Sequence, residues 1–422
     1  MKKSLFILPA VLLMMASCSS DDPITPDIPE TPDTPESPEI PDNPDQELEV
    51  YRIELTQSEQ TAMNSIDEFS HKFMCEMAMA KGDEAYSCSP VSAAIYLSMM
   101  ANAAGGDTRT QLLNALEVTD LETLNSLNAK LMKYLPCEGY GSSLSINNAF
   151  WVADRFTVND IFRNAIVENY QGNVEYVDFS NSATVPAINR WVSDKTNGLI
   201  PCFLSGGWES YIDKDMVSAN TVYFRGKWNQ QFDKANTKEE TFHGVNGDVR
   251  VSMMHQVIES GYAKNDIAQL VVKDFKDGFN YVEFYLPAEG EDIKAFTAKL
   301  TPAEQNKLRK AAKTYDVTLA LPSFKAENEE RFNNVLAKLG VNTANFDFSG
   351  MGLQPAPLGT LQITSIKMDE EGAEMAAVTG GWTSSDLPEE YPSVTVTFNR
   401  PYLYIVRNHK TNAILMAGTV VE

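Results

Sequence analysis

The sequence predicts a single large α+β domain that follows an export leader and a stalk. Helical patterns come first, between residues 56 and 135, and strand-like runs alternate with helices from Leu144 onward. Nothing between Val50 and Glu422 has the composition of a linker, and no internal repeat is present. We therefore expect one domain over residues 50–422, although the total length would accommodate two or three.

Residues 1–18 have the pattern of a lipoprotein signal peptide. Two lysines precede twelve apolar residues, Leu5 to Ala16, which are too few to span a bilayer. The segment ends in Met15-Ala16-Ser17-Cys18, which resembles a bacterial lipoprotein box, so Cys18 is the expected lipidation site. The alternative is a plain cleaved signal. Several acyl chains would give a stable membrane anchor.

The segment after Cys18 indicates where the protein is exposed. Ser19-Ser20-Asp21-Asp22 resembles the surface-export signals of some Gram-negative lipoproteins. We therefore expect an exported outer-membrane lipoprotein that faces the cell exterior rather than the periplasm.

Residues 19–49 form an acidic, proline-rich stalk. Eight prolines recur at every third position from Pro23 to Pro44. Polyproline II has three residues per turn, so these prolines share one edge of an extended rod of roughly 70 Å. The alternative is a disordered tether of no defined length.

The first three helices have clear start signals. Thr56-x-x-Glu59 is a capping box, and the helix that it opens is expected to end at Gly82. Ser89-Pro90-Val91-Ser92 opens a second helix through about Ala104, which is apolar nearly all round and so is expected to be buried. Thr119-x-x-Glu122 is the expected cap of a third helix that ends at Leu135.

The rest of the domain alternates strands with helices. Further helices are expected from Val158 and over residues 187–198. The strand-like runs are residues 144–152, 174–179, 216–224, 249–254, 279–286, 317–321, 361–368, 393–406 and 413–421, with a turn at residues 408–410.

The stretch from Asp369 to Leu387 has a composition unlike that of its surroundings. It begins acidic, passes Gly372, and continues through small residues that offer little for a core to hold. Such a segment suits an exposed loop that can later become a strand, and Gly372 supplies a hinge because glycine crosses freely between φ regions. The pairs Glu370-Glu371 and Glu389-Glu390 are interpreted as solvated loop charges, since adjacent residues do not face a common substrate on a strand.

Two motifs in this region carry a family resemblance. The stretch Glu370-Glu371-Gly372-Ala373-Glu374-Met375-Ala376-Ala377 resembles the reactive-loop hinge of the serpins. The stretch Phe398-Asn399-Arg400-Pro401-Tyr402-Leu403-Tyr404-Ile405-Val406 resembles their C-terminal signature. The resemblance covers residues 50–422. It implies a serpin fold with a central, mostly antiparallel main sheet, further sheets, about eight to nine helices and an exposed reactive loop.

The resemblance also implies a cluster that controls opening of the main sheet. Ser89, Ser92 and Asn220 match the polar cluster under the opening sheet, and Gln362 stands where the family usually has histidine. Trp228 matches the tryptophan at the point where the loop first enters. Taken singly, a buried serine is usually a helix cap and a lone tryptophan is usually part of a core.

The implied function is inhibition of a serine protease, or of a cysteine protease, by suicide-substrate trapping. A protease would cleave the loop and form an acyl-enzyme, and the hinge would then insert into the main sheet. On the inserted strand Ala373, Met375, Ala377 and Thr379 share one face. Met375 is large where the family usually has alanine, so we expect slower insertion. The alternative is a non-inhibitory, serpin-like surface binding lipoprotein.

The loop sequence bears on the target protease. Counting forward from Gly372 places the scissile bond at Asp386-Leu387, and counting back from Arg400-Pro401 places it at Glu390-Tyr391. Residues 372–399 contain no lysine or arginine, which disfavours a trypsin-like target. A protease that prefers Asp or Glu is the first expectation, and an elastase- or chymotrypsin-like protease that cuts near Trp382 is the second.

Other chemistries find no support in the sequence. The four histidines lie far apart without metal-ligand spacing, and no nucleophile elbow, Walker loop or dinucleotide fingerprint is present. We expect no catalytic residues, no metal and no cofactor, and hence not an enzyme.

A net charge of -24 argues against nucleic acid as a partner. We expect a monomer that contacts the membrane only through its lipid.

Four cysteines follow Cys18, namely Cys75, Cys88, Cys137 and Cys202. Their pairing is left open, with free thiols favoured for Cys75 and Cys88.

Overall fold

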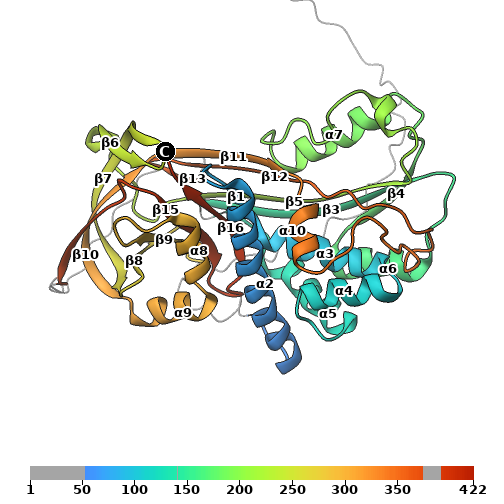
Figure 1. The fold of residues 1–422 in the computed structure, drawn as a ribbon, viewed down its shortest axis with the longest axis horizontal. Helices are drawn as coiled ribbons and strands as arrows, with labels where there is room; N and C mark the ends of the chain where they lie inside the picture. Colours follow the sequence, from blue (N-terminus) through green and yellow to red (C-terminus); the bar gives the residue numbers. More distant parts are fainter. Residues whose placement is uncertain (1–52, 140, 374–390) are drawn as a thin grey trace, which may run out of the picture. The chain divides into compact units, whose positions relative to one another are not determined.

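The computed structural model describes residues 53–139, 141–373 and 391–422. These residues contain nine α-helices and two β-sheets, which gives the α+β domain that the sequence predicts (Figure 1). The helices are α2 (Gln57–Lys81), α3 (Pro90–Ala103), α4 (Gly106–Ala115), α5 (Leu121–Tyr134), α6 (Asp160–Tyr170), α7 (Thr184–Lys195), α8 (Ile293–Lys299), α9 (Pro302–Ala311) and α10 (Asn333–Lys338).

The main sheet has seven strands in the described part of the chain. They are, in spatial order, β11 (Phe324–Glu330), β12 (Gln362–Met368), β13 (Gly372–Ala373), β5 (Met216–Lys227), β3 (Ser142–Ala153) and β2 (Cys137–Gly139), with β4 (Asn173–Val177) also paired to β3. All of these pairs are antiparallel except β3 with β4.

The second sheet lies beside the main sheet and holds the C-terminal strands. Its described strands are β1 (Ser87–Cys88), β16 (Ile414–Val420), β15 (Tyr402–Asn408), β9 (Asn280–Pro287), β8 (Ala268–Asp274), β7 (Gly247–Lys264), β10 (Lys313–Pro322) and β14 (Ser393–Thr397) in spatial order, with β6 (Lys238–Gly244) paired to β7. The central strands β9, β15 and β16 are buried along their whole length, as strands covered on both faces must be.

Helices cover both faces of the main sheet. Side chains alternate along β5, so that Ser218 and Asn220 contact α3 on one face while Val217 and Ala219 pack in the cluster of α7 on the other. Figure 1 shows α7 on one side of these strands and α3 to α6 on the other. The helix α3 is buried nearly all round, as the sequence predicts. Its polar Ser98 can be buried because the hydroxyl donates to the carbonyl of Ala94 in the same helix.

The structure corrects several local expectations. The N-cap of α5 is Asp120, whose carboxylate accepts from the amide of Thr123 at 2.7 Å, and not Thr119. The expected single strand over residues 393–406 is two strands, because the chain leaves β14 before Phe398 and enters β15 at Tyr402. The helices α4, α8, α9 and α10 and the strands β6, β8 and β11 were not predicted individually.

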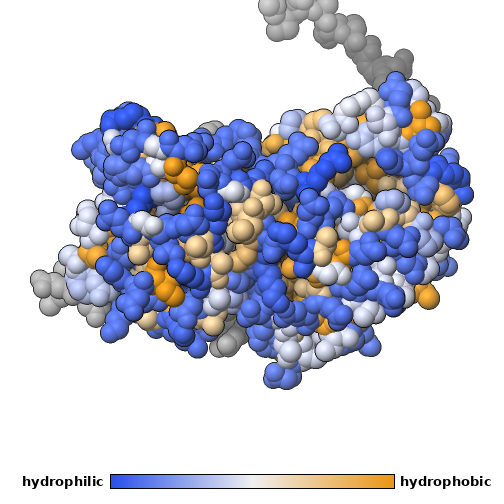
Figure 2. Space-filling model, viewed as in Figure 1, coloured by the Kyte–Doolittle hydropathy of each residue, from blue (hydrophilic) through white to orange (hydrophobic). Residues whose placement is uncertain are grey.

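The face of the described domain that Figure 2 draws is mostly polar. Figure 2 shows hydrophobic residues on this face in scattered small groups between hydrophilic ones. None of the described helices has the length and hydropathy needed to cross a membrane.

Cys75, Cys88, Cys137 and Cys202 are all free thiols, so the preference for free Cys75 and Cys88 is confirmed. Burial raises the pKa of the Cys75 thiol to about 11 and the pKa of Cys137 to about 12.

Candidate functional site

The hinge begins inside the main sheet. Gly372 pairs with Lys227 and Ala373 pairs with Gly226 on β5, while Ala373 also pairs with Met368 on β12. Gly372 has a φ of +145°, and a Cβ atom there would lie 2.1 Å from the carbonyl oxygen of Gly226. Only glycine allows this approach of two backbones.

Trp228 holds the turn that leads into the hinge. Its indole N–H donates to the carbonyl of Asp369 at 2.9 Å, and its backbone N–H donates to the carbonyl of Glu371 at 3.0 Å. The ring is fully buried and stacks on Phe275 with a centroid distance of 4.8 Å. Trp228 therefore holds the backbone immediately before Gly372, at the point where β13 joins the sheet.

The expectation that the two glutamates before Gly372 are solvated loop charges is wrong, because both carboxylates are bound by side chains. The carboxylate of Glu370 accepts from the hydroxyl of Thr237 at 2.7 Å, and the carboxylate of Glu371 pairs with Lys234 at 2.6 Å. That hydrogen bond raises the pKa of Lys234. Both partners come from the segment that follows β5, which was not singled out in the sequence because the contact is long-range.

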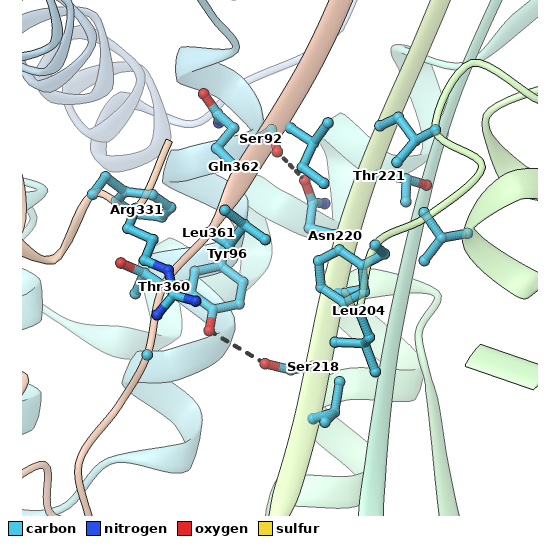
Figure 3. A pocket seen from close by; sticks show the side chains of 18 of the residues that line it. Ser92, Tyr96, Leu204, Ser218, Asn220, Thr221, Arg331, Thr360, Leu361 and Gln362 are labelled. Carbon is cyan, nitrogen blue, oxygen red and sulfur yellow. Dashed lines mark hydrogen bonds between the residues drawn. The ribbon is translucent and has the colours of Figure 1, made fainter. Parts of the chain in front are cut away.

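Below the hinge the main sheet has a gap. In the described part of the chain, β5 and β12 are joined through the two residues of β13 and are otherwise unpaired with each other. A cavity of about 770 Å³ occupies this gap, lined by β5 from Met216 to Phe224 and by the stretch from Leu358 to Ile366. Figure 3 shows Leu361 and Gln362 on one side of the cavity and Ser218 and Asn220 on the other.

The N-terminus of α3 binds the β12 side of this gap. The amide oxygen of Gln362 accepts from the backbone N–H of Ser89 at 3.0 Å, and its amide nitrogen donates to the backbone carbonyl of Ser89 at 3.0 Å. The hydroxyl of Ser89 donates to the carbonyl of Leu415 on β16 at 2.7 Å. One glutamine thus satisfies both backbone groups of the residue that caps α3.

The same end of α3 binds the β5 side. The hydroxyl of Ser92 donates to Asn220 at 2.5 Å, Asn220 donates to Asn148 at 2.6 Å, and Asn148 donates to the carbonyl of Tyr170 at 2.7 Å. One turn further along α3, Tyr96 and Ser218 share a hydrogen bond at 3.2 Å (Figure 3). Ser89, Ser92, Asn220 and Gln362 are therefore brought together, and α3 connects the two strands that flank the gap. Asn148 and Tyr96 were not predicted.

In the described residues, β5 and β12 are joined at one end by β13 and flank a cavity along the rest of their length. Both strands are antiparallel to β13, and within the described residues only Gly372 and Ala373 pair in the position between them. The family profile described as Serpin (serine protease inhibitor) matches residues 64–422. The chain belongs to the serpin family. The members of this family are generally protease inhibitors rather than enzymes.

Relatives of this serpin include proteins of Thermococcus kodakarensis and Gallus gallus. It is 28% identical to an uncharacterized serpin-like protein of Thermococcus kodakarensis over 86% of both chains. It is also 28% identical to neuroserpin of Gallus gallus, over 85% of this chain and 91% of neuroserpin. The crystal structure of the thermophilic serpin tengpin in its native state superposes with a TM-score of 0.77 at 29% identity, covering 88% of this chain and 96% of tengpin.

Some predicted residues lie outside the described part of the serpin. They are Cys18, Glu374, Met375, Ala376, Ala377 and the scissile-bond candidates Asp386, Leu387 and Glu390. The remaining candidate, Tyr391, is the first described residue after the gap. The leader and the stalk also lie outside, so they stay predictions.

Replacing Gln362 with leucine is expected to lower the free energy of unfolding by about 1 to 3 kcal/mol. The change removes two hydrogen bonds and leaves the buried N–H of Ser89 without a partner, while the C=O of Ser89 keeps the hydrogen bond from the N–H of Ala93. Urea denaturation measures the loss. The matched control is Gln354→Leu, because Gln354 lines the same cavity but is exposed. Equal stabilities of the two variants would contradict the role given to Gln362.

Proposed function

We propose that this serpin inhibits a serine or cysteine endopeptidase by suicide-substrate trapping. The observation that carries the proposal is the pairing of Gly372 and Ala373 at the head of an unfilled strand position. The target protease acylates on the loop, the loop is cleaved, and the freed hinge continues along β5 and β12. Insertion carries the attached protease with it and distorts its active site.

Energetics indicate what has to drive the insertion. A dozen new ladder hydrogen bonds contribute about 1 kcal/mol each, while ordering the chain costs about 1 to 2 kcal/mol per residue. The new hydrogen bonds alone therefore do not suffice, and burial of side chains in the cavity has to supply the rest. A small distortion of the protease active site is enough to stall it, because loss of one oxyanion-hole donor raises the barrier to deacylation by about 3 to 4 kcal/mol.

The proposed target is not trypsin-like. A trypsin-like pocket needs lysine or arginine before the scissile bond, and residues 372–399 have neither. A bond at Asp386-Leu387, or at Glu390-Tyr391, suits a protease that prefers acidic residues. A bond near Trp382 suits an elastase- or chymotrypsin-like enzyme.

The leader and stalk support a proposal about location. A lipid on Cys18 would anchor the chain in the outer membrane, and the extended stalk would hold the inhibitor outside the cell. Labelling with radioactive palmitate, with Cys18→Ala as the control, tests this, and protease shaving of intact cells tests the exposed face. Label retained in the variant would contradict the anchor.

The inhibitory mechanism is tested by incubating residues 19–422 with Glu-specific, elastase-like and chymotrypsin-like proteases. We expect a band at the summed mass that survives SDS, with trypsin as the negative control. Mass spectrometry of the released C-terminal peptide then identifies the cleaved bond.

A cleaved chain beside a fully active protease would contradict trapping. The melting temperature of the cleaved chain then decides between the remaining functions. A large rise shows that the loop still inserts, too slowly to trap, as expected if Met375 hinders entry. No rise would make the non-inhibitory binding lipoprotein the leading function.

A further inference from the structure

A buried lysine lies directly under the entry point of the hinge. Lys273 on β8 is only 3% exposed, and its amine lies 5.1 Å from the ring centroid of Trp228 and 4.6 Å from that of Phe232. It donates to the backbone carbonyl of Gln230 at 2.6 Å and to the side chain of Gln256 at 3.3 Å. Within the described residues, the amine forms no ion pair.

The residues that cover this amine also carry the hinge. We call residues 228–232 the lid. The backbone N–H of Trp228 donates to the carbonyl of Glu371, and the backbone N–H of Phe232 donates to the carbonyl of Glu370 at 2.9 Å. Lys273 bonds to the lid from the other side, at Gln230. One short segment therefore lies between the hinge and the amine, and a movement of the hinge pulls on the cover of Lys273.

We propose that Lys273 is a positioning residue for loop insertion: its amine holds the lid in place, and lifting of the lid during insertion lets the amine take up a proton. The proposal rests on the proposed function, because it concerns the same insertion step. It makes the rate of insertion depend on pH through one named group.

The direction of this dependence follows from solvation. Burial lowers the pKa of Lys273 from 10.5 to about 7. A lifted lid admits water, so the pKa of the amine returns toward its ordinary value. Between these two pKa values the lifted form binds a proton that the closed form does not, so acid favours lifting. With full solvation the lifting equilibrium changes about tenfold per pH unit above pH 7, and it levels off below pH 7.

Other charged groups surround the site without supplying a direct counterion. Asp274, the neighbour on β8, is the group whose charge raises the pKa of Lys273. The charged groups on the elements packed around the lid are Lys234, Asp369, Glu370 and Glu371 on the hinge side, and His255 and Glu259 beside Gln256 on β7. Four of them are paired elsewhere, since Lys234 binds Glu371, His255 binds Glu240 and Asp369 binds Lys367.

The test measures entry of a strand into the gap without any protease. The probe is a rhodamine-labelled synthetic peptide with the sequence of residues 373–386, and its entry into residues 19–422 is followed by fluorescence anisotropy from pH 7.0 to 8.5. Carboxylates do not titrate in this range. For the unaltered chain we expect the rate to rise by about fivefold to thirtyfold as the pH falls to 7.0.

Two variants remove the amine and one serves as a control. Lys273→Met keeps the length of the side chain, and Lys273→Leu is the second choice if the first folds poorly. Both are expected to change by less than about twofold over the same range. Lys276→Met is the matched control, because Lys276 is exposed and lies three residues away. It should follow the unaltered chain.

The outcomes separate this proposal from the proposed function. Entry that does not depend on pH in the unaltered chain, or the same rise in Lys273→Met, overturns the coupling and leaves insertion intact. If the peptide fails to enter at every pH and cleavage of the loop leaves the melting temperature unchanged, insertion itself is overturned, and the coupling with it.

Discussion

Replacing Gly372 with alanine is expected to convert the inhibitor into a substrate. The added Cβ would lie 2.1 Å from the carbonyl of Gly226, and the φ of +145° is strained for any residue with a Cβ. Insertion continues from this existing pairing, so we expect it to become about 2 to 3 kcal/mol less favourable, which slows insertion roughly 30- to 150-fold. Deacylation then overtakes trapping, so the SDS-stable adduct disappears while loop cleavage continues.

The gel assay with purified protease measures this change directly, as the ratio of adduct to cleaved chain. Gly359→Ala is the control, because Gly359 has no atom within 4 Å of an added Cβ and lies at the edge of the same cavity. It should trap as well as the unaltered chain. An undiminished yield of adduct from Gly372→Ala would show that insertion does not depend on the pairing of Gly372 with β5.

The elements with local start signals are the ones that the sequence predicts well. The capping box at Thr56 and the Ser89-Pro90 start both open helices in the structure. The helix α4 was missed because it begins at Gly106 with no side-chain cap. In contrast, α9 has a readable signal: Thr301 accepts from the amide of Glu304, and Pro302 follows it. This signal is sufficient to predict the start of a helix at Pro302.

The residues of the candidate site likewise fall into those that belong to local sequence motifs and those that meet only through long-range contacts. Gly372, Trp228 and the residues around the gap belong to recognisable motifs, so their positions could be predicted. The partners of the glutamates could not, because Lys234 and Thr237 reach the hinge only after β5 and β12 have assembled. Lys273 shows the limit most clearly. It stands in a strand-like run, and its burial depends on two aromatic rings that lie more than 40 positions earlier in the chain.

Lys273→Met is expected to stabilise the serpin, by an amount that depends on pH. The pKa of Lys273 is about 7 in the folded chain and near 10.5 when solvated. Below pH 7 the folded chain keeps a buried charge, so its full penalty of about 4 to 5 kcal/mol is present. Between pH 7 and 10.5 the unfolded chain binds a proton that the folded chain lacks, so the stability of the unaltered chain rises with pH.

The quantity that checks this is the difference in unfolding free energy between Lys273→Met and the unaltered chain, from urea titrations at pH 6.5, 8.0 and 9.5. It should fall by about 1.4 kcal/mol per pH unit above pH 7, while Lys276→Met should give a flat difference. A flat difference for Lys273→Met would mean that the amine already reaches water in the closed state. The lid would then be no barrier to protonation.

A pH-dependent difference in stability, combined with a pH-independent rate of peptide entry, would show that Lys273 is buried but is not uncovered when the hinge moves. The two measurements together therefore separate the burial of Lys273 from its coupling to the hinge.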